Sequence, residues 1–113
     1  MSPLKIALTY MEIFFSGKNM ERLYDILADD LIFEGPFYQF HSAQEYIDSL
    51  VSAPPIDCEY KLLKSFANGN SVNLLYTFSK PGISTPMSQW FEICDGKISK
   101  ILLIFDTGKF MNS

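Results

Sequence analysis

The sequence predicts an α+β fold in which three N-terminal helices pack on an antiparallel β-sheet. Apolar residues recur at helical spacing in the part of the chain before Pro55, and the period changes to two soon afterwards. Three pairs of turn-forming residues then divide the remaining sequence. The 113 residues suffice for one hydrophobic core but not for two, so we expect a single domain over residues 1–113.

Two helices are predicted at the start of the chain. The first begins at Ser2 and Pro3, a favourable N-cap and first-turn pair, and ends at Gly17. Its expected apolar face consists of Leu4, Ala7, Leu8, Met11 and Phe15. Asn19 is placed to cap the second helix. The expected buried residues of that helix are Met20, Leu23, Tyr24 and Leu27.

A short strand and a third helix come next. Residues 31–34 have the pattern of a strand. Ser42 and Glu45 form a capping box, which predicts a helix that the prolines at 54 and 55 stop. The side chains expected to face inward are Tyr46, Ile47, Leu50 and Val51.

Residues 57–106 are predicted to form four long strands. The turns between them are Asn68–Gly69, Pro81–Gly82 and Asp95–Gly96. The last strand carries only apolar residues over 101–105, so both of its faces must be covered. Helices can cover one face, and a second copy of the chain can cover the other. We therefore expect a homodimer joined through the outer faces of the sheets.

Charge and composition exclude several classes of function. The net charge is −4 and Arg22 is the only arginine, so a basic surface for nucleic acid is not expected. Cys58, Cys94 and His41 do not form a zinc-binding pattern, and neither a metal nor a cofactor is expected. No apolar run approaches the roughly 20 residues of a membrane span, and Glu12 interrupts the apolar N-terminal segment. The expected location is the cytoplasm, with no membrane partner.

Two segments carry a resemblance to a known family. LADDLIFEGP (27–36) and FEICDGKISKILLIFD (91–106) resemble the first-strand segment and the terminal hairpin of the SnoaL-like, nuclear transport factor 2-like superfamily, whose members include ketosteroid isomerases and limonene epoxide hydrolases. The resemblance covers nearly the whole chain. It implies a cone-shaped fold with a strongly curved sheet, and a small apolar molecule bound between the sheet and the helices.

The catalytic groups of these relatives are largely missing. The resemblance places Met11, Gly35 and Ser88 where an isomerase has its tyrosine, its base and its protonated acid. The epoxide hydrolase arrangement is also absent, because Arg22 lies on the second helix rather than on a central strand. Asp106 alone resembles a catalytic residue, and it is the candidate general acid or base. Strand parity points it outward, so this role requires a bulge or a turn at the strand end.

Two functions therefore remain open. The first is a domain that binds a small hydrophobic ligand, with no reaction specified. The alternative is a cyclase, isomerase or hydrolase that acts on an apolar small molecule through Asp106. In both cases the expected ligand-binding residues are Met11, Phe15, Phe33, Tyr46, Leu50, Ser88, Trp90, Ile101, Leu103 and Phe105. Several tyrosines can bury a ring while the hydroxyl reaches a ligand, although most such tyrosines are core residues with a satisfied hydroxyl and no single one stands out. They are Tyr10, Tyr38, Tyr46 and Tyr76.

Overall fold

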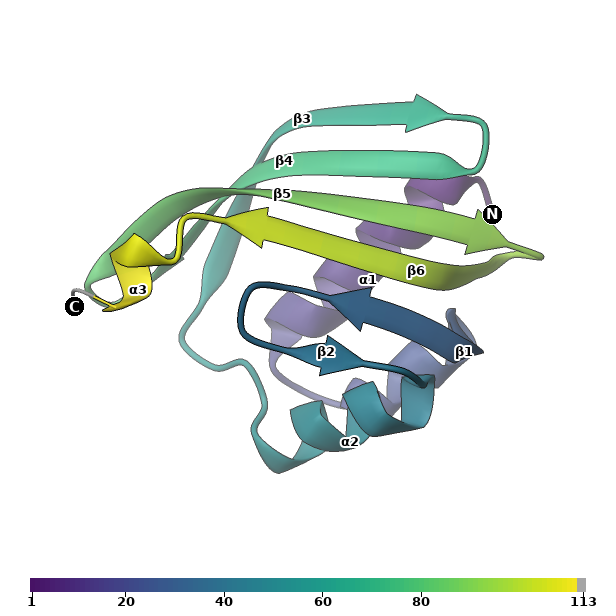
Figure 1. The fold of residues 1–113 in the computed structure, drawn as a ribbon, viewed down its shortest axis with the longest axis horizontal. Helices are drawn as coiled ribbons and strands as arrows, with labels where there is room; N and C mark the ends of the chain where they lie inside the picture. The colour runs from purple at the N-terminus through teal and green to yellow at the C-terminus, as the bar shows by residue number, and fades with distance from the viewer. Residues whose placement is uncertain (112–113) are drawn as a thin grey trace.

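The structure, a computed structural model, describes residues 1–111 of the chain. It confirms the α+β class and the curved sheet (Figure 1). The helices are α1 (Pro3–Ser16), the 3-10 helix η1 (Met20–Asp25), α2 (Ala43–Ser52) and the short α3 (Gly108–Met111). The strands are β1 (Leu27–Glu34), β2 (Gln39–Phe40), β3 (Glu59–Asn68), β4 (Ser71–Lys80), β5 (Ile83–Cys94) and β6 (Lys97–Phe105).

The caps of α1 and α2 are those that the sequence predicts. The Ser2 hydroxyl accepts a hydrogen bond from the backbone N–H of Lys5, and Gly17 ends α1 in the left-handed conformation. The Ser42 hydroxyl accepts from the N–H of Glu45. The buried face of α2 is as predicted except at Val51, which is exposed.

The second helix differs from its prediction. Asn19 makes no side-chain capping bond and has a left-handed backbone, and the segment that follows is a 3-10 helix. That helix is too short to bury four side chains on one face, so Tyr24 is exposed and Leu27 belongs to β1 instead. β1 therefore begins four residues earlier than predicted. Further along the chain, β5 begins at Ile83, directly after the predicted Pro81–Gly82 turn.

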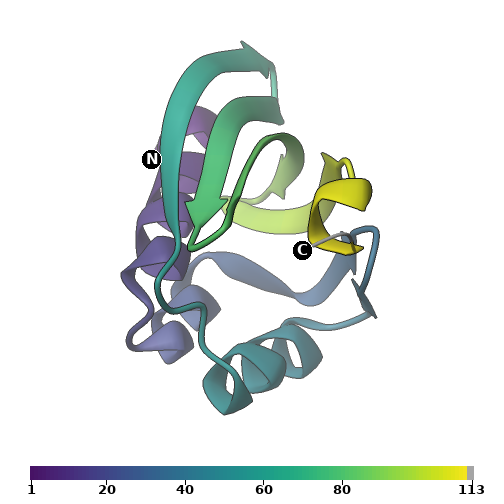
Figure 2. The ribbon, with the colours of Figure 1, turned by 90° about the vertical axis from the view of Figure 1, so that its left-hand side faces the viewer.

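The sheet has the strand order β2-β1-β6-β5-β4-β3. Neighbouring strands are antiparallel except for β1 and β6, which run parallel. Figure 2 shows the sheet curving in cross-section, with α1 along one side, α2 below and α3 on the opposite side. In the described residues 1–111, no helix is long and apolar enough to cross a membrane.

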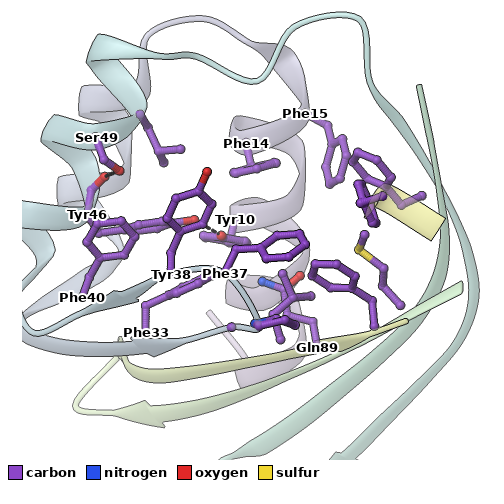
Figure 3. A pocket seen from close by; sticks show the side chains of 18 of the residues that line it. Tyr10, Phe14, Phe15, Phe33, Phe37, Tyr38, Phe40, Tyr46, Ser49 and Gln89 are labelled. Carbon is purple, nitrogen blue, oxygen red and sulfur yellow. Dashed lines mark hydrogen bonds between the residues drawn. The ribbon is translucent and has the colours of Figure 1, made fainter. Parts of the chain in front are cut away.

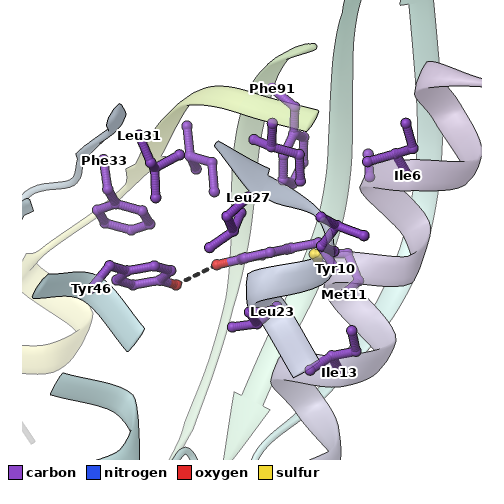
Figure 4. Packing of buried hydrophobic residues seen from close by; sticks show 14 of the residues in the cluster. Ile6, Tyr10, Met11, Ile13, Leu23, Leu27, Leu31, Phe33, Tyr46 and Phe91 are labelled. Carbon is purple, nitrogen blue, oxygen red and sulfur yellow. Dashed lines mark hydrogen bonds between the residues drawn. The ribbon is translucent and has the colours of Figure 1, made fainter. Parts of the chain in front are cut away.

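The two faces of the sheet differ in character. The inner face packs on α1, η1 and α2 through a core that includes Tyr10 and Met11 from α1, Leu31 from β1 and Phe91 from β5 (Figure 4). One row of paired residues crosses the opposite side, which we call the outer face. This row consists of Phe66, Asn73, Trp90, Leu102 and Glu34.

Candidate functional site

A cavity of about 590 Å³ lies between the inner face of the sheet and the helices α1, α2 and α3. We call it the aromatic cavity, because most of the residues that line it have aromatic rings (Figure 3). Its buried lining residues form the base: Tyr10, Phe33, Tyr46, Leu50, Tyr76, Met87 and Gln89. Its exposed lining residues form the rim: Pro36, Phe37, Tyr38, Ala53 and Lys80. The volume suits a small organic molecule.

The walls are held by contacts between rings. Phe33 from β1 stacks on Tyr46 from α2, with ring centroids 4.7 Å apart. Phe105, at the end of β6, packs edge-on against Phe110 of α3 at 5.0 Å and against Phe37 at 5.5 Å. These rings come from elements far apart in the sequence. The curvature of the sheet brings them around one space.

The base of the aromatic cavity holds a chain of polar side chains. The Tyr76 hydroxyl donates a hydrogen bond of 2.7 Å to Oε1 of Gln89. The hydroxyls of Tyr10 and Tyr46 are hydrogen-bonded to each other, as the dashed line in Figure 4 shows. All four side chains are buried, so each must satisfy its hydrogen-bonding capacity within the protein or from a ligand.

Burial keeps these phenols neutral. It raises the pKa of Tyr10 to about 12, against opposing effects of the hydrogen bonds to Tyr46 and Gln89. Burial likewise raises the pKa of Tyr46 and that of Tyr76, and the neighbouring Tyr10 adds to both rises. Near neutral pH each hydroxyl therefore carries its proton and can donate it.

Tyr10 and Tyr46 together have one hydroxyl hydrogen to spare. Two hydroxyl groups carry two hydrogens, and the bond between them uses one. Among residues 1–111 neither hydroxyl donates to an acceptor outside the pair, because the neighbouring Gln89 amide lowers the pKa of Tyr10 and therefore faces its oxygen as a donor. Whichever tyrosine donates to the other, the second hydrogen is left for a molecule in the cavity.

Charge is scarce in the lining. Among the described residues that line the cavity, Lys80 alone is charged, and none is Asp, Glu, His or Cys. Among the described residues, no group of three or more His, Cys, Asp or Glu side chains is arranged to hold a metal ion. The aromatic cavity can therefore hold an apolar molecule and donate a hydrogen bond to it, but its lining offers neither a carboxylate nor an imidazole for proton transfer.

Six of the residues predicted for ligand binding line the aromatic cavity: Phe15, Phe33, Tyr46, Leu50, Leu103 and Phe105. Met11 and Ile101 do not, because both are fully buried in the core beneath it. The strand parity assigned to β6 places Leu103 and Phe105 correctly on the inner face. Contact between the six lining residues and a ligand stays a prediction.

The parity predicted for β5 is wrong. Trp90 lies on the outer face and is 37% exposed, and Ser88 shares that face, where its hydroxyl hydrogen-bonds with the side chain of Asn73. Gln89, which lies between them on the same strand, is 3% exposed and lines the cavity. The inward set on this strand is Met87, Gln89, Phe91 and Ile93.

Asp106 lies outside the aromatic cavity. β6 ends at Phe105 without the bulge that would turn the next side chain inward. The Asp106 carboxylate is exposed and accepts a 2.9 Å hydrogen bond from the backbone N–H of Gly108, the first residue of α3. This position gives the carboxylate a local backbone partner and leaves it outside the described lining of the cavity.

Sequence reasoning missed the central polar residues of the site. Tyr10 was one of several tyrosines, and no sequence feature separated it from the rest. Gln89 had a usable signal, because its alternate neighbours Met87, Phe91 and Ile93 are all apolar and mark the inward face. The resemblance, which puts Ser88 at a pocket position, favoured the opposite parity and with it Trp90. Lys80 and Phe110 had no signal, because the curvature of the sheet alone brings them to the cavity.

Comparisons with known proteins agree with this architecture. The profile of the SnoaL-like domain family matches residues 7–101. An NTF2-like protein of unknown function from Cytophaga hutchinsonii superposes with a TM-score of 0.84 at 19% identity, over 98% of this chain and 96% of that one. An LEH-like epoxide hydrolase from M. tuberculosis has a TM-score of 0.80 at 17% identity, over 97% of this chain and 86% of that one. No curated protein sequence matches the chain.

The fold by itself does not imply a natural function. A de novo designed protein with a curved β-sheet superposes with a TM-score of 0.74 at 21% identity, over 96% of this chain and 90% of the designed one. At such identities the structural likeness shows the fold alone. Function must be argued from the side chains in the aromatic cavity.

Proposed function

The chain belongs to the SnoaL-like domain family, and from this premise we propose that its aromatic cavity binds one small apolar molecule that carries a hydrogen-bond acceptor. The observation that carries the proposal is the Tyr10–Tyr46 hydroxyl pair, which has a spare donor at the buried base of an apolar space. The acceptor atom of the ligand is a neutral oxygen, such as that of a ketone, an ester or an ether.

The energetics favour an acceptor over a purely apolar ligand. A hydrocarbon would gain from burial against the rings but would leave the spare hydroxyl hydrogen unpaired in an apolar setting. A neutral hydrogen bond in such a place is worth about 0.5–1.5 kcal/mol, which is about three- to tenfold in affinity. A ligand that brings only another donor gains less, because the spare group of the pair is itself a donor.

No observation favours catalysis. The similar protein from M. tuberculosis is an LEH-like epoxide hydrolase, but the described residues that line the cavity in this chain include no carboxylate, and Asp106 lies outside the lining. Binding without turnover needs only the groups that the cavity contains. The ring walls supply affinity, and the tyrosine pair supplies orientation.

A matched pair of probes tests the proposal. The ketone 2-acetylnaphthalene and the hydrocarbon 2-ethylnaphthalene have similar shapes, but only the ketone has an acceptor. Titration calorimetry should show binding of both, with the ketone bound about three- to tenfold more tightly. Failure of both probes to bind at their solubility limits would contradict the proposal.

Tyrosine variants separate the hydrogen bond from the apolar fit. In Tyr10→Phe or Tyr46→Phe one hydroxyl remains and can still donate, so part of the preference for the ketone should persist. The double variant Tyr10→Phe/Tyr46→Phe should bind the two probes equally. Tyr38→Phe, which removes a hydroxyl at the exposed rim, is the control and should keep the full preference. A ketone preference that survives in the double variant would place the acceptor elsewhere.

A further inference from the structure

We propose that the acceptor-bearing molecule bound in the aromatic cavity is also a monocarboxylate, with its neutral oxygen at the Tyr10–Tyr46 pair and its carboxylate at the rim against the ammonium group of Lys80. This inference rests on the proposed function and names the class of ligand. The observation behind it is the position of the Lys80 ammonium group in the lining of the cavity.

Lys80 is the last residue of β4 and one of the exposed residues of the rim. Within the part of the chain that the structure describes, it is the only charged residue of the lining, and the net charge of the chain is −4. A cation at the mouth of an otherwise apolar space gives the two ends of the cavity different chemistry. The base donates from neutral hydroxyls, and the rim offers a positive charge beside solvent.

The Lys80 ammonium is held near the rim without being neutralised. Its Nζ lies 5.5 Å from the centroid of the Phe110 ring, which is itself part of the lining. In residues 1–111 no carboxylate lies within ion-pair distance of this nitrogen. Since an aromatic face attracts an ammonium without accepting its N–H hydrogens in strong bonds, Lys80 keeps donors for a ligand.

Phe110 links this charge to the interior of the cavity. Its ring packs on Phe105 and Phe78, with centroids 5.0 Å and 6.0 Å away, and both of these rings line the same space. A ligand lying against them would reach the ammonium where the apolar wall ends. An amphipathic ligand fits a cavity that is apolar inside and positively charged at its rim, because its apolar body can lie inside and its charge outside.

The charges on the far side of Lys80 limit the anion to one negative charge. A second, shallower hollow is lined by Asp57, Cys58, Glu59 and Lys80, among others. The Lys80 charge is close enough to Cys58 to oppose the rise in pKa that burial causes in that thiol. Asp57 and Glu59 repel anions, and one lysine with no arginine beside it is a weak partner for a dianionic phosphate.

A carboxylate at the rim costs less than one at the base. At the base it would lose its hydration among rings and neutral hydroxyls, whereas at the exposed rim it stays partly hydrated. The gain from an exposed ion pair is modest, at about two- to fivefold in affinity. It should shrink as salt is added.

Decanoate and decan-1-ol are the probes for the test, because they share an apolar chain and differ in charge. At low ionic strength and neutral pH, calorimetry on the wild-type protein should show decanoate bound about two- to fivefold more tightly. This preference should fall toward unity in high salt. In Lys80→Met the preference should be lost while the affinity for decan-1-ol stays within about twofold, since the methylene stem is kept.

Lys109→Met is the matched control. Lys109 is an exposed lysine of α3 that does not line the aromatic cavity, so its removal changes the net charge equally and should leave the preference in place. Circular dichroism should show both variants folded. Equal binding of the two probes by the wild type, or a decanoate preference that persists in Lys80→Met, overturns this inference. Failure of these probes and of both naphthalenes overturns the proposed function instead.

Discussion

At the scale of single residues, Tyr10 joins the core to the aromatic cavity. Its ring packs edge-on against Phe91 at 5.4 Å, while its hydroxyl is bonded to Tyr46 in the cavity wall. The same burial that packs the ring raises the pKa of the phenol to about 12. The stability of the fold and the protonation of the site are therefore linked through this residue.

Alkaline pH should destabilise the protein through Tyr10. The folded-state pKa is raised above the ordinary value of 10.0, so the contribution is fully present below pH 10 and is lost as the pH rises from 10 toward about 12. Between pH 9 and pH 11 the free energy of unfolding should fall by about 1 kcal/mol on account of Tyr10 alone. Urea unfolding at the two pH values measures this loss.

Two variants isolate that effect. Tyr10→Phe should be less stable at pH 9, because it loses a hydrogen bond, but its stability should fall less between pH 9 and pH 11. Tyr38→Phe changes an exposed tyrosine, and its free energy of unfolding should fall as much as that of the wild type. An equal fall in Tyr10→Phe and in the wild type would show that this phenol does not control the alkaline transition.

Some residue positions could be read from the sequence and others could not. Phe33, Tyr46 and Leu50 combine a clear period with an apolar side chain, and all three line the cavity. The inward placement of Trp90 follows from its shared parity with Ser88, which the resemblance puts at a pocket position, whereas the buried residues of this strand are the alternate ones, Gln89 among them. Asp106 was placed by resemblance, and the local hydrogen bond to Gly108 decides its position instead.

At the scale of elements, Gly17 fixes the end of α1 against the segment after α2. Its backbone is left-handed, with φ +68°, and a Cβ placed there would lie 2.8 Å from the carbonyl oxygen of Pro55. That distance is too short for any real Cβ contact. Both the conformation and the close approach therefore require glycine.

Gly17→Ala should destabilise the protein by about 2 kcal/mol or more, because backbone strain and the contact with Pro55 add. Gly69→Ala is the matched control: Gly69 has φ +62° and open space around the Cβ position. Gly69→Ala should lower the free energy of unfolding by about 1 kcal/mol, from backbone strain alone. Urea unfolding measures both values, and equal losses would mean that the approach to Pro55 is not tight.

The elements with both a cap and a stop signal were predictable. The Ser2, Gly17 and Ser42 signals place the ends of α1 and α2 correctly, and the three turns place β3 to β6. The segment from Met20 to Glu34 was not predictable in the same way. Its leucines and isoleucines suit a helix or a strand equally, and pairing with β6 decides where the strand begins.

At the scale of the whole molecule, the outer face of the sheet carries large apolar side chains that the chain leaves exposed. Phe66 is 59% exposed and Ile104 is 56% exposed, and Trp90 lies between them on the same face. In the described residues 1–111, no helix covers this face. The homodimer predicted from the last strand stays a prediction, and this surface is where it would form.

Light scattering at micromolar concentration should give twice the chain mass of 12.9 kDa. Trp90→Glu should lower the observed mass toward that of one chain, because a dimer interface would bury the new charge. Val51→Glu, at an exposed position on α2, is the control and should leave the mass unchanged. A single-chain mass for the wild type would contradict the homodimer.

The fold of the whole chain could be recognised from its sequence, whereas the contents of its cavity could not. Two short segments and the order of the elements indicated a cone-shaped architecture. The spare hydroxyl hydrogen of Tyr10 and Tyr46 depends on a contact between α1 and α2 that no local pattern specifies. The same is true of Lys80, because no local pattern specifies its contact with the Phe110 ring of α3.

The most direct test of ligand binding in the aromatic cavity is the NMR signal of the Met87 methyl group. With methionine methyl groups labelled with ¹³C, the five methionines report on separate places, and of those described only Met87 lines the cavity. Titration with 2-acetylnaphthalene should shift the Met87 signal saturably, because the bound ring system lies against it, and leave that of Met20, buried in η1, in place. A Met87 signal that does not move at the solubility limit of the ketone would contradict the account.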